Sequence, residues 1–243
     1  MLGIVSKKPI DARILQEFRQ LSENGKTPKD FGCEQASKRV GHPDGWGIAC
    51  LAGDNEVYRR SPLKASQDPK FEEALREIGQ LSSPPYVLVA HIRRASTIDT
   101  IAEMNNQPFR REFDGRVVFF AHNGEVKGYG LRDGRIDSHA YFERLLEGLG
   151  TEPVTPETFR LRLKETKDSM ATEFPKKVSS LTFLMSDDDE IVAHRDAREC
   201  RPYYSLHEAK GQDCMVVCSE VLSSVVGQWR LLRNDETVTL SVL

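Results

Sequence analysis

VAHIRRAS (Val89–Ser96) and FFAHNGE (Phe119–Glu125) each begin as an apolar run and end in polar or charged residues. The continuous apolar runs Tyr86–His91 and Val117–His122 are bounded by turn residues, which is typical of strands buried on both faces. An arginine follows the first run, and an Asn-Gly pair follows the second. Because these groups can bind a carboxylate or an oxyanion, we expect the ends of the two strands to contribute to a site.

Helical and strand patterns occupy separate blocks elsewhere in the chain. Apolar residues fall on one helical face between Ile14 and Leu21, and again between Phe71 and Ile78. Blocks of strands, then helices, then strands predict an α+β fold in layers rather than a βαβ repeat. Further helices are expected from Asp137 or Ser138 and from Thr155-Pro156-Glu157, a hairpin from Gly47–Leu51 with Val57–Arg59, and short strands at Leu181–Met185, Ile191–Ala193, Tyr203–Leu206, Met215–Cys218 and Thr237–Val242.

The composition is that of an ordinary globular protein. Hydrophobic residues make up 39% of the 243 residues, charged residues make up 29%, and the net charge is -3. This balance gives no reason to expect nucleic acid or a membrane as partner, and no apolar run approaches the ~20 residues of a spanning helix. Since no linker divides the chain, residues 1–243 are expected to form a single domain. Met1–Ile10 lacks the apolar core of a signal peptide, which favours a cytoplasmic protein.

Five cysteines occur at irregular spacings. Cys214 and Cys218 lie four residues apart in a strand pattern, which places them on one face and does not form a zinc knuckle. We therefore expect no metal site, and we expect buried thiols in the reduced state.

Arg93 follows the first buried strand and can bind a carboxylate through two parallel hydrogen bonds. A lone arginine is more often paired with a surface glutamate, so this interpretation depends on the neighbouring motifs. Arg94 competes with Arg93 for the role, because adjacent strand residues point to opposite faces.

Asn123 and Gly124 allow two interpretations. An Asn-Gly pair at the end of a strand is a strong signal for a type I′ hairpin turn. The pair could instead form an oxyanion hole, with the Asn123 amide and the Gly124 backbone N–H as donors. Alone, the pair favours the turn.

Asp137 precedes a predicted helix, where aspartate usually caps the first turn. It could also bind the ammonium group of an amino-acid substrate. His91 and His122 end apolar strands, and we interpret both as structural histidines. A carboxylate clamp, an oxyanion-binding pair and an ammonium acceptor together meet the needs of glutamine recognition and amide cleavage.

These motifs resemble the glutaminase domain of class II glutamine amidotransferases. The family's His-x-Arg-x-Ala-(Thr/Ser) motif matches His91–Ser96, and its His-Asn-Gly motif matches His122–Gly124. Its Asn-x-His-Pro-(Phe/His) motif matches Asn105–Phe109, with glutamine in place of histidine. The runs that look like the stand-alone branch of the family are His42–Gly47, Phe183–Asp187 and Cys218–Leu222.

The resemblance implies a role for each matching residue. Arg93 would bind the glutamine α-carboxylate, Ser96 occupies the family's hydroxyl position, and Asp137 would bind the α-amino group. Asn123 and Gly124 would form the oxyanion hole.

The resemblance also implies a fold and a mechanism. The fold is that of the N-terminal-nucleophile (Ntn) hydrolases, a four-layer αββα sandwich. A cysteine that becomes residue one attacks the glutamine amide, and its own α-amino group, of pKa ~7.7–8.0, acts as the base. No metal or organic cofactor is implied. Since the glutaminase fold uses the whole chain, ammonia would pass to a separate synthase, or the substrate would be a γ-glutamyl amide of a larger molecule. The oligomeric state is not specified.

The N-terminus MLGIV (Met1–Val5) departs from the family because it contains no cysteine. In one interpretation Leu2 replaces the cysteine, and the protein is a catalytically inactive, glutamine-binding regulator. In the other, Met1–Gly3 matches the end of the family pattern Cys-Arg-(bulky)-(Leu/Phe)-Gly, and translation starts upstream with Met-Cys-Arg. We favour the upstream start, because the substrate-binding residues are retained, and we expect the chain as given to be inactive. Cys33 is a third candidate nucleophile, but it has no free amino group to act as base.

Overall fold

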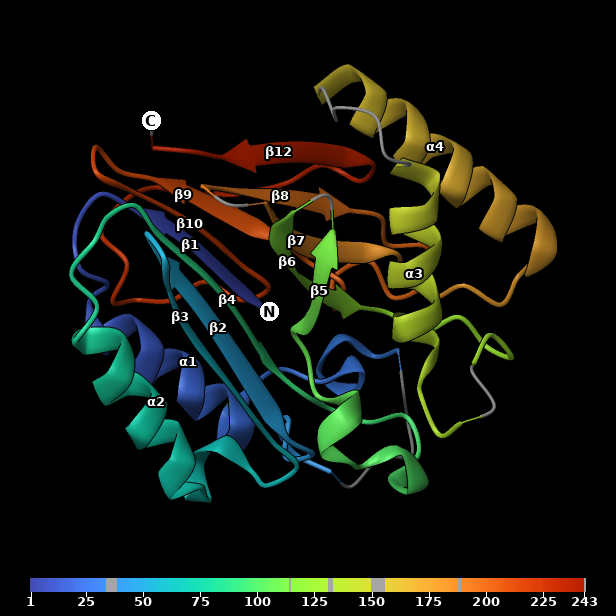
Figure 1. The fold of residues 1–243 in the computed structure, drawn as a ribbon. Coiled ribbons are helices and arrows are strands. Elements are labelled where there is room, and N and C mark those ends of the chain that lie inside the picture. The colour runs from blue at the N-terminus through green and yellow to red at the C-terminus, as the bar shows by residue number, and fades with distance from the viewer. Residues whose placement is uncertain (34–38, 114, 131–132, 150–155, 188, 243) are drawn as a thin grey trace.

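Two antiparallel β-sheets stacked face to face form the centre of the computed structural model, which describes all residues except 34–38, 114, 131–132, 150–155, 188 and 243 (Figure 1). The strands of the seven-stranded sheet lie in the order β11-β9-β10-β1-β4-β2-β3, and those of the five-stranded sheet in the order β12-β8-β7-β6-β5. The strands are β1 (Leu2–Ser6), β2 (Trp46–Ala52), β3 (Asn55–Ser61), β4 (Tyr86–Ile92), β5 (Phe109–Phe113), β6 (Arg116–Asn123), β7 (Thr182–Asp187), β8 (Glu190–Arg195), β9 (His207–Lys210), β10 (Cys214–Cys218), β11 (Trp229–Leu231) and β12 (Glu236–Leu240).

Helices cover the outer face of each sheet. The helices α1 (Ala12–Asn24) and α2 (Pro69–Gly79) pack on the seven-stranded sheet, and α3 (Asp137–Leu149) and α4 (Pro156–Glu173) pack on the five-stranded sheet (Figure 1). The first two are amphipathic, as predicted, and begin at aspartate caps. Asp11 accepts a hydrogen bond from the Arg13 N–H at 2.9 Å, and Asp68 accepts one from the Lys70 N–H at 3.0 Å.

Three hydrophobic cores separate the four layers. In β4, Leu88 and Ala90 pack under α1 and α2, whereas Val87 and Val89 pack between the sheets. This alternation follows from the two-residue period of a strand, and it buries both faces of β4 as predicted. The third core lies between the five-stranded sheet and α3 and α4, with Phe120 at its centre. The αββα sandwich expected from the resemblance is therefore confirmed.

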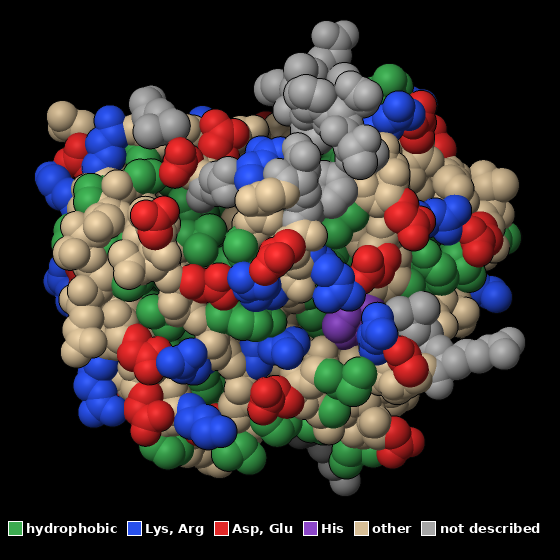
Figure 2. Space-filling view, in the orientation of Figure 1, with side chains coloured by type: hydrophobic (Ala, Val, Ile, Leu, Met, Phe, Trp, Pro, Cys, Tyr) green, Lys and Arg blue, Asp and Glu red, His purple; other side chains and the backbone are tan. Residues whose placement is uncertain are grey.

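The surface carries charges of both signs. Figure 2 shows lysine and arginine side chains intermixed with aspartate and glutamate over the visible face, in keeping with the small net charge of -3. None of the helices in the described part of the chain combines the length and apolar character that crossing a bilayer requires.

Two sequence-based predictions of elements have different outcomes. The strand expected at Tyr203–Leu206 is wrong, because the Cys200 carbonyl accepts the N–H of Tyr203 at 2.9 Å and closes a turn there. Cys200 itself has a φ of 34°, in the left-handed region. Strand β9 begins only at His207. Helix α4 begins at Pro156, as expected, although Thr155 lies outside the described residues.

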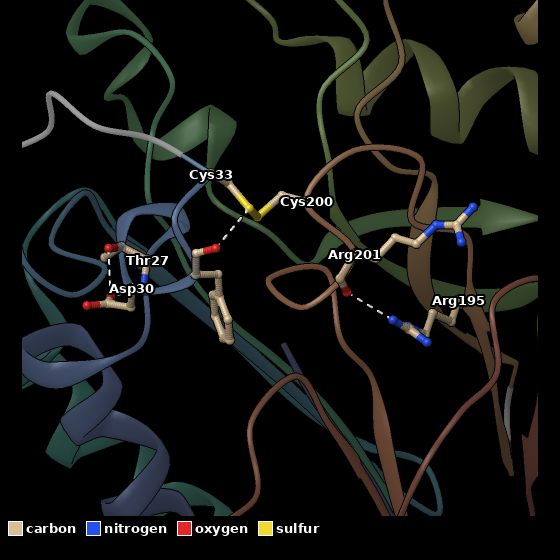
Figure 3. The surroundings of a disulfide bond; sticks show 7 residues. Thr27, Asp30, Cys33, Arg195, Cys200 and Arg201 are labelled. Carbon is tan, nitrogen blue, oxygen red and sulfur yellow. Dashed lines mark hydrogen bonds between the residues drawn. A yellow bond between two sulfur atoms is a disulfide. The ribbon is translucent and has the colours of Figure 1, made fainter.

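The expectation of reduced cysteines is also wrong in part. Cys33 and Cys200 form a disulfide with a Cα–Cα distance of 5.7 Å (Figure 3). Cys50, Cys214 and Cys218 are free, and two of these thiols are buried. While the disulfide is intact, Cys33 cannot act as a nucleophile, because its sulfur is already bonded.

Candidate active site

A pocket of about 520 Å³ opens where β1 begins and where β4 and β6 end. The antiparallel pairing of β1 with β4 brings the first residue of the chain beside the end of β4. All five residues predicted for the site line this one pocket, together with Met1 and His91; the five are Arg93, Ser96, Asn123, Gly124 and Asp137. Four of them are buried or half-buried, and Ser96 is exposed to solvent.

Arg93 is only 5% exposed. Its guanidinium donates to the Thr100 carbonyl oxygen at 2.9 Å and to the Thr100 hydroxyl at 2.8 Å. Among the residues that the structure describes, no carboxylate pairs with Arg93, so donors remain for a ligand. Burial lowers the pKa of Arg93, and the charges of Asp44 and Asp137 oppose this shift. Arg94 is half-buried beside it and donates to the Arg39 carbonyl at 3.3 Å.

Asp44 and Gly45 hold the backbone of Arg93. The Arg93 N–H donates to the Gly45 carbonyl at 2.8 Å, and the Asp44 N–H donates to the Arg93 carbonyl at 3.0 Å. The Asp44 carboxylate accepts the Ala95 N–H at 2.7 Å and also pairs with Arg39. Sequence analysis missed this function, because Pro-Asp-Gly by itself indicates only a turn.

Gly45 is required by close packing. Its φ is 118°, and a Cβ atom there would lie 2.4 Å from the Asn106 side-chain oxygen. The Asn106 amide in turn donates to the Ser61 carbonyl at 2.7 Å. Within the run His42–Gly47, Gly45 thus allows the backbone that bonds Arg93 to pack closely against Asn106.

Asn123 and Gly124 do not form a type I′ turn. That turn needs positive φ at both central residues, and neither residue has one. Strand β6 ends at Asn123, and its neighbour β7 begins only at Thr182, so the pair does not join adjacent strands. A Cβ atom on Gly124 would lie 2.0 Å from the Ser180 carbonyl oxygen, which excludes any side chain without a backbone shift. Only glycine therefore lets the backbone at position 124 approach the Ser180 carbonyl this closely.

His122 is structural, as the sequence predicts. Its Nδ1 lies 2.9 Å from the Ser138 hydroxyl and its Nε2 lies 3.0 Å from the Ser180 carbonyl oxygen. Burial lowers its pKa to about 4, so the ring is neutral at neutral pH. It ties the end of β6 to the start of α3 and to the segment before β7.

His91 differs from this expectation. It is buried and lines the pocket, but its Nδ1 has no hydrogen-bond partner in the described part of the chain. Burial holds its pKa well below 6.5, so it is a neutral imidazole. Across the residues with described positions, no group of three or more His, Cys, Asp or Glu side chains is arranged to hold a metal ion.

Asp137 is the first residue of α3 and lies on the pocket wall. Its carboxylate accepts the backbone N–H of Val126 at 2.5 Å, which anchors the segment after Gly124. Burial raises the pKa of Asp137 to about 6, and the hydrogen bond from Val126 opposes this shift. At neutral pH the group is mostly ionised and can accept a hydrogen bond from an ammonium group.

Met1 reaches the pocket, but Leu2 does not. The Met1 ammonium is buried and donates to the Ser219 hydroxyl at 3.0 Å, and burial lowers its pKa. The Met1 side chain joins the core between the sheets, whereas Leu2 is fully buried in the core under α1 and α2. Leu2 therefore does not occupy a position from which a side chain could act in the pocket.

Known proteins share both sequence and fold with this chain. The family model for class II glutamine amidotransferases matches residues 24–225. The Escherichia coli K12 protein named "Putative glutamine amidotransferase YafJ" is 31% identical over 162 residues, which cover 63% of this chain and 60% of that protein. A Haemophilus influenzae protein with the name "Putative glutamine amidotransferase" is 31% identical over 191 residues, covering 72% of this chain and 61% of that protein. The chain thus spans less than two thirds of the length of these relatives.

Two solved structures cover 99% of this chain. One is described as "predicted glutamine amidotransferase" from Pseudomonas aeruginosa PA01, with a TM-score of 0.54, 21% identity and 93% of its own length covered. The other is a glutamine aminotransferase class-II domain protein from Silicibacter pomeroyi, with a TM-score of 0.58, 17% identity and 94% of its length covered. At these identities the two structures establish the shared fold.

Proposed function

Because the chain belongs to the class II glutamine amidotransferases, we propose that its pocket binds glutamine or a γ-glutamyl amide and that the active protein hydrolyses the side-chain amide. The observation that carries this proposal is Arg93, a buried cation with no carboxylate partner in the described residues. Burying an unpaired charge is costly, so such a group is best explained by a ligand that supplies the anion.

The α-carboxylate of the substrate would pair with Arg93, and its ammonium group would bind Asp137, which lines the same pocket. The two charges already act on each other, since burial lowers the pKa of Arg93 and the charge of Asp137 opposes this shift. Ser96 would contribute a hydroxyl near the carboxylate. This arrangement leaves the substrate's amide free to reach Asn123 and Gly124, which would donate to the oxyanion.

We propose that the nucleophile is a cysteine two residues before Met1. Residues two apart in a strand point to the same face. If β1 continued by two residues, the added side chain would face the same side as Met1, which is one of the residues that line the pocket. The extension would also replace the buried Met1 ammonium with a neutral peptide group.

In the proposed mechanism the cysteine α-amino group takes the thiol proton, and the thiolate attacks the amide carbonyl carbon. Asn123 and Gly124 would stabilise the tetrahedral oxyanion while the nitrogen receives the proton and leaves as ammonia. Water then hydrolyses the glutamyl thioester and releases glutamate. We propose that residues 1–243 act as one glutaminase domain in the cytoplasm, and that ammonia passes to a separate synthase.

The rival function is glutamine binding without turnover, which the absence of cysteine between Met1 and Ser6 favours. Two proteins separate the alternatives: the chain as given, and the same chain preceded by Met-Cys-Arg. Calorimetry measures glutamine binding, and glutamate release measures turnover. Our proposal expects binding by both and turnover only by the extended protein. Binding by both with no turnover by either would favour the regulator.

A further inference from the structure

The disulfide joins two loops that come from different sheets. Cys33 lies in the connection from α1 to β2 in the seven-stranded sheet, and Cys200 lies between β8 of the five-stranded sheet and β9 (Figure 3). The two residues are 167 positions apart in the chain. Cys33 is exposed and Cys200 is half-buried, so a reductant in solution can reach the bond. Cys50 and Cys218 are buried by comparison.

The next described residue after Cys33 is Arg39, where the groups that hold Arg93 begin. Arg39 donates to the Ala95 carbonyl at 3.1 Å, and Asp44 accepts the Ala95 N–H. Asp44 and Gly45 also bond the backbone of Arg93 on both sides. We therefore expect a displacement of Cys33 to affect the segment that carries Arg93, the proposed ligand of the substrate carboxylate.

The Cys200 loop is anchored from several directions. Arg195 donates to the carbonyl oxygens of Arg201 at 2.9 Å, Tyr204 at 3.1 Å and Leu232 at 2.6 Å (Figure 3 shows the first). These bonds do not involve the disulfide, so we expect this loop to stay in place when the disulfide is broken.

The Cys200 loop also braces the other wall of the pocket. The N–H groups of Arg198 and Glu199 both donate to the Ser179 carbonyl at 2.9 Å. The Ser179 hydroxyl accepts the N–H of Glu125 at 2.9 Å, next to Gly124. The disulfide thus links a fixed support behind the proposed oxyanion donors to the loop that positions Arg93.

We propose that Cys33–Cys200 is a redox modification site that sets the affinity of the pocket for its α-amino-acid ligand. A dithiol reduces it: a thiolate attacks one sulfur, the S–S bond breaks through a mixed disulfide, and the dithiol leaves as a cyclic disulfide while both cysteines become thiols. Reduction releases Cys33 from Cys200 and loosens the support of Arg93. In a reducing cytoplasm such a bond is typically transient and redox-sensing rather than structural.

The expected effect is a loss of preorganisation. With the bond intact, Arg93 is held in its ligand-binding position before the ligand arrives. With the bond broken, ligand binding must order the Arg93 segment again. We expect glutamine to bind roughly tenfold more weakly to the reduced protein. The choice of glutamine as probe rests on the proposed function, but the coupling between the disulfide and the Arg93 segment does not.

The experiment compares the wild-type protein, Cys33→Ser/Cys200→Ser and the control Cys214→Ser, each with and without dithiothreitol. Cys214 is a free cysteine on β10, outside both loops. Alkylation in denaturant without reductant, followed by mass measurement, counts the cysteines that are free thiols. Hydrogen–deuterium exchange measures the amides of residues 39–45 and 93–97, with residues 201–204 as the internal reference. Calorimetry measures glutamine affinity.

We expect two wild-type cysteines to resist alkylation until dithiothreitol is added, and exchange to increase at 39–45 and 93–97 but not at 201–204. Glutamine affinity should fall in the reduced wild type and in Cys214→Ser with dithiothreitol, and the double variant should be weak under both conditions. Five reactive thiols in the oxidised protein, or unchanged exchange on reduction, would overturn the proposal. Increased exchange on reduction, with no glutamine binding to the oxidised or the reduced protein, would count against the proposed function but not against the coupling of the disulfide to the Arg93 segment. Equal glutamine affinity of the oxidised and reduced protein would overturn the proposal that the disulfide sets affinity.

Discussion

Gly124 lies against the Ser180 carbonyl oxygen so closely that a Cβ on Gly124 would be 2.0 Å from it. A methyl group at this position must displace backbone on one side or the other. We expect Gly124→Ala to cost about 1–3 kcal/mol of stability, as overpacking does. Because the Gly124 N–H is a proposed oxyanion donor, turnover by the extended protein should fall by about 10²–10³-fold.

Gly79 provides the matched control for this substitution. It ends α2, and a Cβ there would have no heavy atom within 4 Å of it. Gly79→Ala should leave turnover unchanged and alter stability by less than about 1 kcal/mol. Thermal melts and glutamate release test both variants. Equal behaviour of the two alanine variants would contradict the close-packing argument.

Arg93 should be needed for binding and not for folding. Replacing it with methionine removes a buried charge that has no carboxylate partner in the described structure, so stability should be unchanged or improved. Glutamine affinity should fall by about 10- to 100-fold, the worth of charge-assisted hydrogen bonds. Calorimetry on Arg93→Met and on the neighbouring control Arg94→Met checks this. If both variants lost a similar amount of glutamine affinity, Arg93 would not be the specific carboxylate ligand.

The raised pKa of Asp137 predicts that glutamine affinity depends on pH. Its pKa is raised to about 6, so the carboxylate takes up a proton as pH falls through 6 and can no longer bind an ammonium group as an anion. Glutamine affinity should therefore drop between pH 7 and pH 5. Calorimetry across this range tests the expectation, and an affinity that stays flat would argue against Asp137 as the ammonium ligand.

The same raised pKa predicts that the stability of the fold falls as pH rises, whereas glutamine affinity rises. Between the ordinary aspartate pKa and 6, the folded state holds more protons than the unfolded state, so Asp137 makes the fold less stable as pH rises through this range. Asp137→Asn should stabilise the protein at pH 7 by on the order of 1–2 kcal/mol while it weakens glutamine binding. Denaturant melts at pH 5 and pH 7 should show that the gain is larger at pH 7.

Asp44 should act as a positioning residue for Arg93. Asp44→Asn weakens the pairing with Arg39 and the bond from Ala95, so we expect KM for glutamine to rise about 10-fold in the extended protein with kcat little changed. Asp54→Asn, on the exposed turn between β2 and β3, is the control. A fall in kcat with KM unchanged would show that Asp44 acts on the reaction rather than on binding.

Much of the architecture could be predicted from local patterns. The apolar runs that became β4 and β6 end in polar groups, and the stacking of the two sheets brings those ends to one pocket. Tyr203–Leu206 failed because aromatic residues favour strands only where a neighbouring strand is available, and the turn at Cys200 prevents pairing.

Other features depend on distances in space that a single sequence does not encode. Cys33 and Cys200 are separated by 167 positions, and five cysteines can form several different disulfide pairings. The hydrogen bonds between Asp44 and Arg93 likewise join two segments that are remote in sequence. The register of β1 likewise decides that Met1 packs between the sheets and that Leu2 packs under α1 and α2.

The measurement that tests the central claim most directly is the intact mass of the protein isolated from the organism that makes it. We predict a mass larger than that of the chain beginning at Met1 by a cysteine and an arginine, with the initiator methionine removed. Tandem fragmentation should place the cysteine at the first position. A mass that corresponds to a start at Met1 or Leu2 would contradict the account and favour a protein without glutaminase activity.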